Sequence, residues 1–164
     1  MTTTQDQFSH AELAFAAYAA LPAGVPDPQK LRDAGMSESQ AGAFSKAWSV
    51  VDQVADAAGL SATIFQKDLQ IYLAIRGTQF EAGDLLADAL LALGVSVRLN
   101  PQFEALMAQI DTWRQQGGPL YGKTFSVTGH SLGGYLAAAV KNSYAEVTDA
   151  YLFNAPGSGG LLGN

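Results

Sequence analysis

Apolar residues recur at helical spacing over the first third of the chain and at strand-like spacing after it. Residues 9–12 begin with Ser and end with Glu, the pattern of a capping box, and predict a helix that ends before Pro22. Residues 37–40 have the same pattern with Gln and predict a second helix that stops at Gly59 and carries Phe44, Trp48, Val51 and Val54. We expect both helices to form an N-terminal helical cap, residues 1–59, whose aromatic side chains pack against a sheet.

Strands and helices alternate over the remaining core, residues 60–164. Residues 62–66 and 69–75 predict a hairpin, because a short polar pair separates two runs rich in β-branched and aromatic side chains. A leucine-rich helix is expected after residue 79, and Asn100 with Pro101 predicts the N-cap and first position of another. A strand from residue 124, a helix after Ser131 and a strand at residues 148–153 complete the pattern.

This alternation favours an α/β fold with a mostly parallel sheet and helices on both faces. A length of 164 residues suits one domain, so we expect residues 1–164 to belong to a single folding unit.

Residues 124–137 read as a buried strand, a sharp turn and a helix of small residues, with Ser131 at the turn. Ser131 lies within Gly129-x-Ser131-x-Gly133, the pattern of a nucleophile elbow in the strand–turn–helix context that the motif requires. The glycines have a physical role, because a side chain two residues from the serine would collide with the strand or the helix. The pattern predicts Ser131 as a catalytic nucleophile.

Three strand ends are expected at one edge of the sheet, because the strands are predicted to be parallel. In such sheets ligands bind at the carboxyl ends of the strands. The three ends carry Arg76-Gly77-Thr78, Ser131 and Asn154. Acyl transfer needs a nucleophile, a base and two donors for the developing oxyanion. The Leu132 N–H, at a helix N-terminus, is the first predicted donor, and Thr78, through its N–H or hydroxyl, is the second.

The run Gly129-His130-Ser131-Leu132-Gly133-Gly134, about fifty residues after Ile75-Arg76-Gly77-Thr78, resembles the class 3 lipase family of α/β-hydrolases. Residues 59–65 and 152–157 further resemble a bacterial branch of lipase-like proteins that often carry calcium-binding glycine-rich repeats. The resemblance implies an α/β-hydrolase fold, Ser131 as nucleophile with Thr78 and Leu132 as oxyanion donors, and hydrolysis of carboxylic esters in acylglycerols or phospholipids. It implies that the chain needs no cofactor, with calcium bound only in downstream repeats. It also implies an extracellular location reached without a Sec signal peptide, and a cytoplasmic location is the alternative.

The catalytic acid and base of that family are not evident in this sequence. They should follow the nucleophile in the order Asp, then His, but no histidine follows Ser131. The acidic residues after it are Glu146 and Asp149, and Asp149 lies at the start of its strand, the wrong end of the sheet. Asn154 lies at the right end but cannot ionise. We therefore expect the chain to be the front part of a catalytic domain.

Other polar residues have mainly structural interpretations. His130 is expected to point away from the nucleophile, and His10 to lie on the surface of the first helix, with a role as substitute base the alternative. Arg76 is expected to brace its loop through backbone carbonyls, with substrate contact the alternative.

Asp84 and Asp88 are expected at a solvated helix start. The leucines between residues 85 and 93 are expected in a helix core, with a lid or an acyl-binding wall as the alternative.

Composition narrows the possible partners. The net charge of −6 argues against nucleic acid and against electrostatic docking on anionic membranes. The absence of cysteine excludes disulfides, thiolate metal sites and a cysteine nucleophile. The first residues lack the basic region of a Sec signal peptide, and no apolar run approaches the roughly 20 residues that span a bilayer.

Three functions fit these observations. The first is a serine ester hydrolase whose Asp and His lie on other sequence, the second a catalytically inactive fragment that binds lipid or a partner, and the third acyl transfer or thioester hydrolysis. An incomplete sheet would expose an edge, so self-association through that edge is expected.

Overall fold

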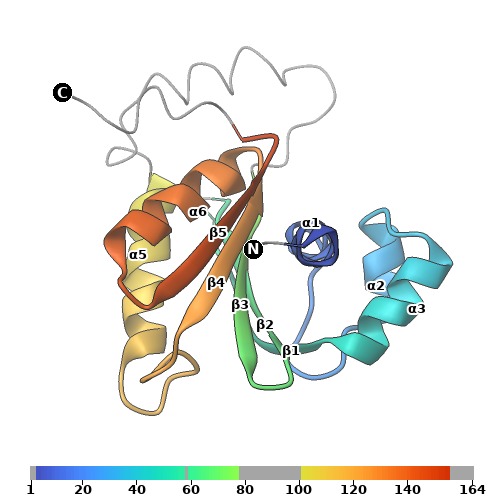
Figure 1. Ribbon diagram of the computed structural model, residues 1–164, viewed down its shortest axis with the longest axis horizontal. Coiled ribbons are helices and arrows are strands. Elements are labelled where there is room, and N and C mark those ends of the chain that lie inside the picture. Colours follow the sequence, from blue (N-terminus) through green and yellow to red (C-terminus); the bar gives the residue numbers. More distant parts are fainter. Residues whose placement is uncertain (1–2, 58, 78–100, 156–164) are drawn as a thin grey trace.

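A five-stranded sheet lies between two layers of helices in the computed structural model (Figure 1). The structure describes residues 3–57, 59–77 and 101–155. The strands lie side by side in chain order: β1 (Ser49–Ala55), β2 (Ser61–Lys67), β3 (Gln70–Ile75), β4 (Phe125–His130) and β5 (Val147–Phe153). The predicted α/β class is confirmed.

The sheet is mixed, which corrects the expectation of a mostly parallel one. The pairs β3–β4 and β4–β5 are parallel, whereas β1–β2 and β2–β3 are antiparallel. The physical reason is the length of the connections, because short loops join neighbouring strands only in the antiparallel sense and parallel pairing needs a crossover. Parallel pairing is therefore confined to the three strands whose carboxyl ends surround the elbow.

Helices cover both faces of the sheet, as predicted (Figure 1). One layer contains α1 (Thr4–Ala16), α2 (Pro28–Asp33) and α3 (Glu38–Ala47), and the other contains α5 (Pro101–Arg114) and α6 (Leu132–Ser143). Among the described residues, no helix is long and apolar enough to cross a membrane.

Successive side chains of the central strands point to opposite faces of the sheet and contribute to a hydrophobic core on each face. On β3, Leu73 and Ile75 pack toward α5 and α6, whereas Ala74 packs toward α1 and α3. On β2, Ile64 and Phe65 divide in the same way. Successive side chains of a strand point to opposite faces, so apolar residues at every position are what a sheet covered on both sides requires.

The first helix begins earlier than predicted. Thr3 and Asp6 make both hydrogen bonds of a capping box, so α1 starts at Thr4 and Ser9 lies inside the helix. The box at Thr3 satisfies orphan N–H groups six residues before the predicted cap, and burial of His10 and Leu13 against the sheet holds the helix there.

The predicted second helix is correct at its start and wrong at its end. Ser37 and Gln40 form the expected capping box, but α3 ends at Ala47 and residues 49–55 are strand β1. Val50 and Val54 pair with β2, and β-branched side chains pack well on a pleated surface. The last part of the expected helical cap is thus an edge of the sheet.

The remaining described elements agree with the sequence pattern except α2, which the pattern did not predict; Asp27 caps this helix and Pro28 is its first residue. The hairpin, the helix that begins at Pro101, the elbow strand, the helix after Ser131 and the last strand are confirmed. The expected leucine-rich helix, with Asp84 and Asp88, lies outside the described residues.

Candidate active site

Ser131 is the single residue between the end of β4 and the start of α6, and its backbone is strained. Its φ is 55° and its ψ is −127°, a backbone conformation that residues other than glycine rarely adopt. The strand, sharp turn and helix predicted around Ser131 are therefore present, and we call this turn the elbow.

Backbone hydrogen bonds hold the elbow on both sides. The Ser131 N–H donates to the Phe153 carbonyl on β5 at 2.9 Å, and the Ser131 carbonyl accepts from Gly134 N–H at 3.0 Å. Ser131 occupies the N-cap position of α6, yet its hydroxyl makes no capping hydrogen bond to the helix. The hydroxyl is therefore not committed to the role that serine most often has at a helix start.

The glycines of the motif are required by close backbone approach. A Cβ added to Gly133 would lie 2.2 Å from the Ile75 carbonyl oxygen, and one added to Gly129 would lie 2.2 Å from the Gly133 carbonyl oxygen. Both distances are far inside van der Waals contact, and the opposing atoms are backbone, which cannot rotate away. The first turn of α6 can therefore pack on the end of β3 only without these side chains.

One of the two expected oxyanion donors, the Leu132 N–H, lies in this turn. Leu132 is the buried first residue of α6, where N–H groups have no acceptor within the helix. Thr78 lies outside the described residues, but Gly77 before it lies against the elbow. A Cβ on Gly77 would be 2.7 Å from the His130 carbonyl oxygen and 3.4 Å from the Gly133 nitrogen.

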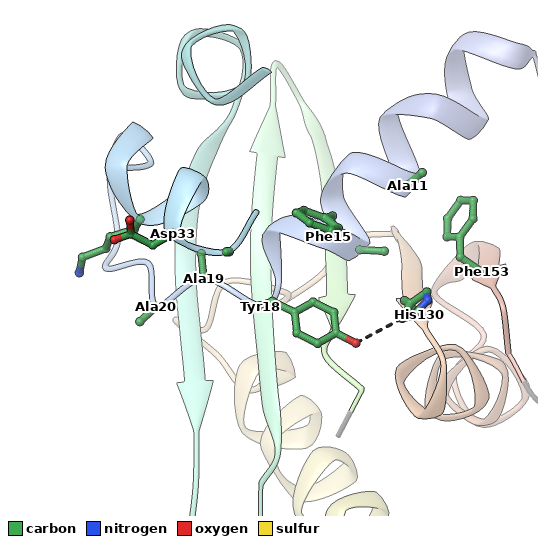
Figure 2. Close-up of a pocket in the computed structure, with 11 residues that line it drawn as sticks. Ala11, Phe15, Tyr18, Ala19, Ala20, Asp33, His130 and Phe153 are labelled. Carbon is green, nitrogen blue, oxygen red and sulfur yellow. Dashed lines mark hydrogen bonds between the residues drawn. The ribbon is translucent and has the colours of Figure 1, made fainter. Parts of the chain in front are cut away.

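Tyr18, to which no sequence motif assigns a role, also lies beside the elbow. Figure 2 shows its side chain extending from the end of α1 toward His130, and its hydroxyl lies 3.3 Å from His130 Nδ1. Burial raises the pKa of the Tyr18 phenol, and a hydrogen bond from Gly77 N–H partly offsets this. The sequence gives no direct signal for this contact, because the half-buried position of Tyr18 depends on how α1 packs on the sheet. His130 thus has a structural partner, consistent with its expected role.

His10 is buried, so its expected place on the helix surface is wrong. Its ring stacks on Tyr151 at 3.5 Å between centroids, and Asp6 and Asp149 approach it. Burial lowers the pKa of His10 to about 4, against the weaker effect of the two carboxylates. His10 lines a polar cavity of about 450 Å³ that also involves Thr124, at the amino ends of the strands. The alternative role as base for Ser131 has no support in this position.

The acidic residues after Ser131 are committed elsewhere or lie far from it. Glu146 forms an ion pair with Arg114, and Asp149 is exposed near the amino end of β5, as expected. Asn154, at the carboxyl end of that strand, has a positive φ of 47°. Within the described ranges, no histidine is hydrogen-bonded to the Ser131 hydroxyl.

Arg76 has the bracing role that the sequence suggested. Its Nη2 donates to the Gly59 carbonyl oxygen at 3.2 Å, which ties the end of β3 to the turn before β2.

An apolar cavity of about 800 Å³, which we call the α1–α2 groove, begins next to the elbow (Figure 2). His130 and Phe153 lie at one end, and the Phe153 carbonyl is the acceptor for Ser131 N–H. The groove follows α1 past Tyr18 and Phe15 to Lys30 and Asp33 on α2. Its size and lining suit an apolar small molecule.

Comparison with known proteins agrees with this geometry. Residues 9–159 match the sequence pattern of a phospholipase-like family, the Tle-like phospholipase domain. No curated protein sequence matches the chain.

Similar folds are found among solved structures. A nonglycosylated LIP2 lipase of Yarrowia lipolytica is 18% identical with a TM-score of 0.56, and the match covers 92% of this chain and 57% of that one. Lipase II of Rhizopus niveus is 17% identical with a TM-score of 0.48, over 93% of this chain and 62% of that one. The chain therefore spans about three fifths of the length of these lipases.

The close approach at the elbow predicts a large difference between two glycine substitutions. Gly133→Ala is expected to lower the free energy of unfolding by about 3 kcal/mol or more, because its methyl group meets the backbone of β3. Gly42→Ala is the matched control in α3, where no atom lies within 4 Å, and should raise it by about 0.5–1 kcal/mol. Urea unfolding measures both, and equal effects would contradict the account of the turn.

Burial of His10 predicts a pH-dependent stability. The pKa of His10 falls from 6.5 in the unfolded chain to about 4 in the folded one, so the unfolded state binds more protons between these values. This contribution is complete above pH 6.5 and is lost as the pH falls toward 4, by at most about 3 kcal/mol. His10→Phe keeps the stack on Tyr151 and should flatten the dependence in urea unfolding at pH 7 and pH 4.5. An unchanged slope would show that His10 titrates normally.

Proposed function

Since the chain belongs to the family of Tle-like phospholipase domains, whose members are related to lipid ester hydrolases, we propose that Ser131 is the nucleophile of a carboxylic ester hydrolase acting on lipids. The observation that carries the proposal is the backbone of Ser131, with its positive φ between β4 and α6. A strained conformation at a serine is retained only where the surroundings enforce it, and here two glycines and β3 do so.

The chemistry follows the acyl-transfer pattern. The Ser131 hydroxyl oxygen attacks the ester carbonyl carbon as a base removes its proton, and the carbonyl oxygen becomes an oxyanion. The Leu132 N–H and a donor from Thr78 stabilise that charge, each contributing about 3–4 kcal/mol to the transition state. Collapse expels the alcohol with the proton from the base, and water then releases the acyl group from the serine.

The base and its acidic partner are proposed to come from sequence outside these 164 residues. Neither described histidine suits the role, because His10 lies toward the amino ends of the strands and His130 is engaged with Tyr18. The solved lipase with the higher TM-score is longer than this chain, which covers 57% of it. An Asp and then a His in the coding sequence after residue 164, each at a predicted strand end, would supply both groups.

Phospholipid is the proposed substrate class within the lipid esters, and acylglycerol is the alternative. The family description names a phospholipase, and the apolar groove beside the elbow suits an acyl chain, which both classes share. Hydrolysis of vesicles of phosphatidylcholine against an emulsion of triacylglycerol separates the two.

A second candidate is a lipid-binding module without catalysis. The observation that favours it is the combination of a groove of about 800 Å³ with a serine that has no base among the described residues. The two candidates share the groove and differ in whether the serine turns over an ester.

Three further expectations remain predictions. They are export without a Sec signal peptide in a bacterial setting, calcium only in downstream glycine-rich repeats, and self-association through a sheet edge. Light scattering at high concentration tests the last of them.

The 164-residue chain alone is predicted to be a very poor esterase. Loss of the base lowers kcat on the order of a millionfold in serine proteases, and the same deficit is expected here. Release of p-nitrophenol from p-nitrophenyl butyrate measures the activity, with Ser131→Ala as the control. Fast turnover that disappears in Ser131→Ala would mean that this chain already holds its base.

A further inference from the structure

Phe15 lies between two apolar hollows on the side of α1 that faces α2. Its side chain lines the α1–α2 groove and also a smaller cavity of about 300 Å³, which we call the distal hollow. Ala11 lines both cavities as well. The distal hollow is completed by Phe8, Glu12, Gly35, Met36 and Gln40.

The ring of Phe15 reaches across from α1 to the turn that follows α2. A Cβ added to Gly35 would lie 3.1 Å from Phe15 Cζ, so the tip of the ring rests on the backbone of that turn. Gly35 has a φ of +108°, which a larger residue rarely adopts, and the contact is therefore available only to glycine. Phe15 and Ala11 therefore form the wall that the groove and the distal hollow share.

The aromatic side chains on this side face solvent to an unusual extent. Phe15 is 43% exposed and Phe8 is 51% exposed, whereas Phe44 in the core is 2% exposed. Contiguous exposed apolar surface in a soluble protein marks a site for an apolar ligand or partner.

We propose that the α1–α2 groove holds the acyl chain of the substrate and that Phe15 sets the length of chain that it accepts. The assignment of substrate rests on the proposed function. Three observations favour an acyl chain as the occupant. The groove starts at His130 and Phe153, on either side of the elbow, and alanines and aromatic rings line its course. Its charged residues, Lys30 and Asp33, both belong to α2. In Figure 2 Asp33 lies on the opposite side of the groove from His130.

The length of acyl chain that can be buried then depends on the ring of Phe15. A saturated chain that enters at the elbow is buried only over the length of the groove, and each methylene buried there strengthens binding by about fourfold. Carbons that the groove cannot hold remain in water and add nothing. Without the ring, the same chain continues into the distal hollow toward Phe8 and Met36.

Displacement of cis-parinaric acid from the chain by saturated fatty acids of increasing length tests this, because binding needs no catalysis. In the unaltered chain, affinity should rise with length and then become level. In Phe15→Ala, the rise should continue for at least two more methylenes, about fifteenfold in affinity. Phe15→Trp should reach the level at a shorter chain. Phe8→Ala removes an aromatic ring that lines only the distal hollow, and it should leave the profile of the unaltered chain in place.

Each result decides the proposal. Opposite shifts in Phe15→Ala and Phe15→Trp, with none in Phe8→Ala, support it. Failure of the unaltered chain to bind any fatty acid would overturn the groove as an acyl site, and identical profiles in all variants would overturn the role of Phe15. If fatty acids bind with the expected shifts but the complete gene product hydrolyses no ester, the proposed function is contradicted. The groove as a site for an acyl chain is then still supported.

Discussion

The fit of the first turn of α6 against the end of β3 is the constraint on which the site depends. Gly133 lies so close to the Ile75 carbonyl that no side chain can occupy the space, and Gly129 faces the Gly133 carbonyl in the same way. This contact forces the chain to turn within one residue, and the strain is borne by Ser131. Parallel pairing of β3, β4 and β5 brings the other strand ends, Gly77 and Asn154, to the same edge.

The same edge links Ser131 to the α1–α2 groove. The Ser131 N–H is held by Phe153, and Phe153 also lines the α1–α2 groove. Tyr18 connects the groove to the end of β3 and to His130, so α1 is tied directly to the site and is more than a cover for the sheet. The elbow and the α1–α2 groove are therefore built by one set of contacts. The base and acid that we propose for Ser131 would belong to a different part of the fold, since the triad order places them after the nucleophile.

Local signals made the elbow predictable, and tertiary contacts decided what the sequence could not show. The strand, turn and helix around Ser131 are encoded by adjacent residues, as are the capping box at Ser37 and the start of the helix at Pro101. Residues 49–55 form a strand although Trp48, Val51 and Val54 have helical spacing, because pairing with β2 overrides that local pattern. Burial of His10 and the reach of Tyr18 depend on where α1 lies against the sheet, for which the sequence of α1 holds no direct signal.

The central claim is that Ser131 is the nucleophile of a lipid ester hydrolase. Its most direct test is release of fatty acid from phosphatidylcholine vesicles by the complete gene product, compared with the same protein carrying Ser131→Ala. The account predicts release that is abolished in the variant while the variant remains folded. Release that is equal in the two proteins, or none from either, would contradict it.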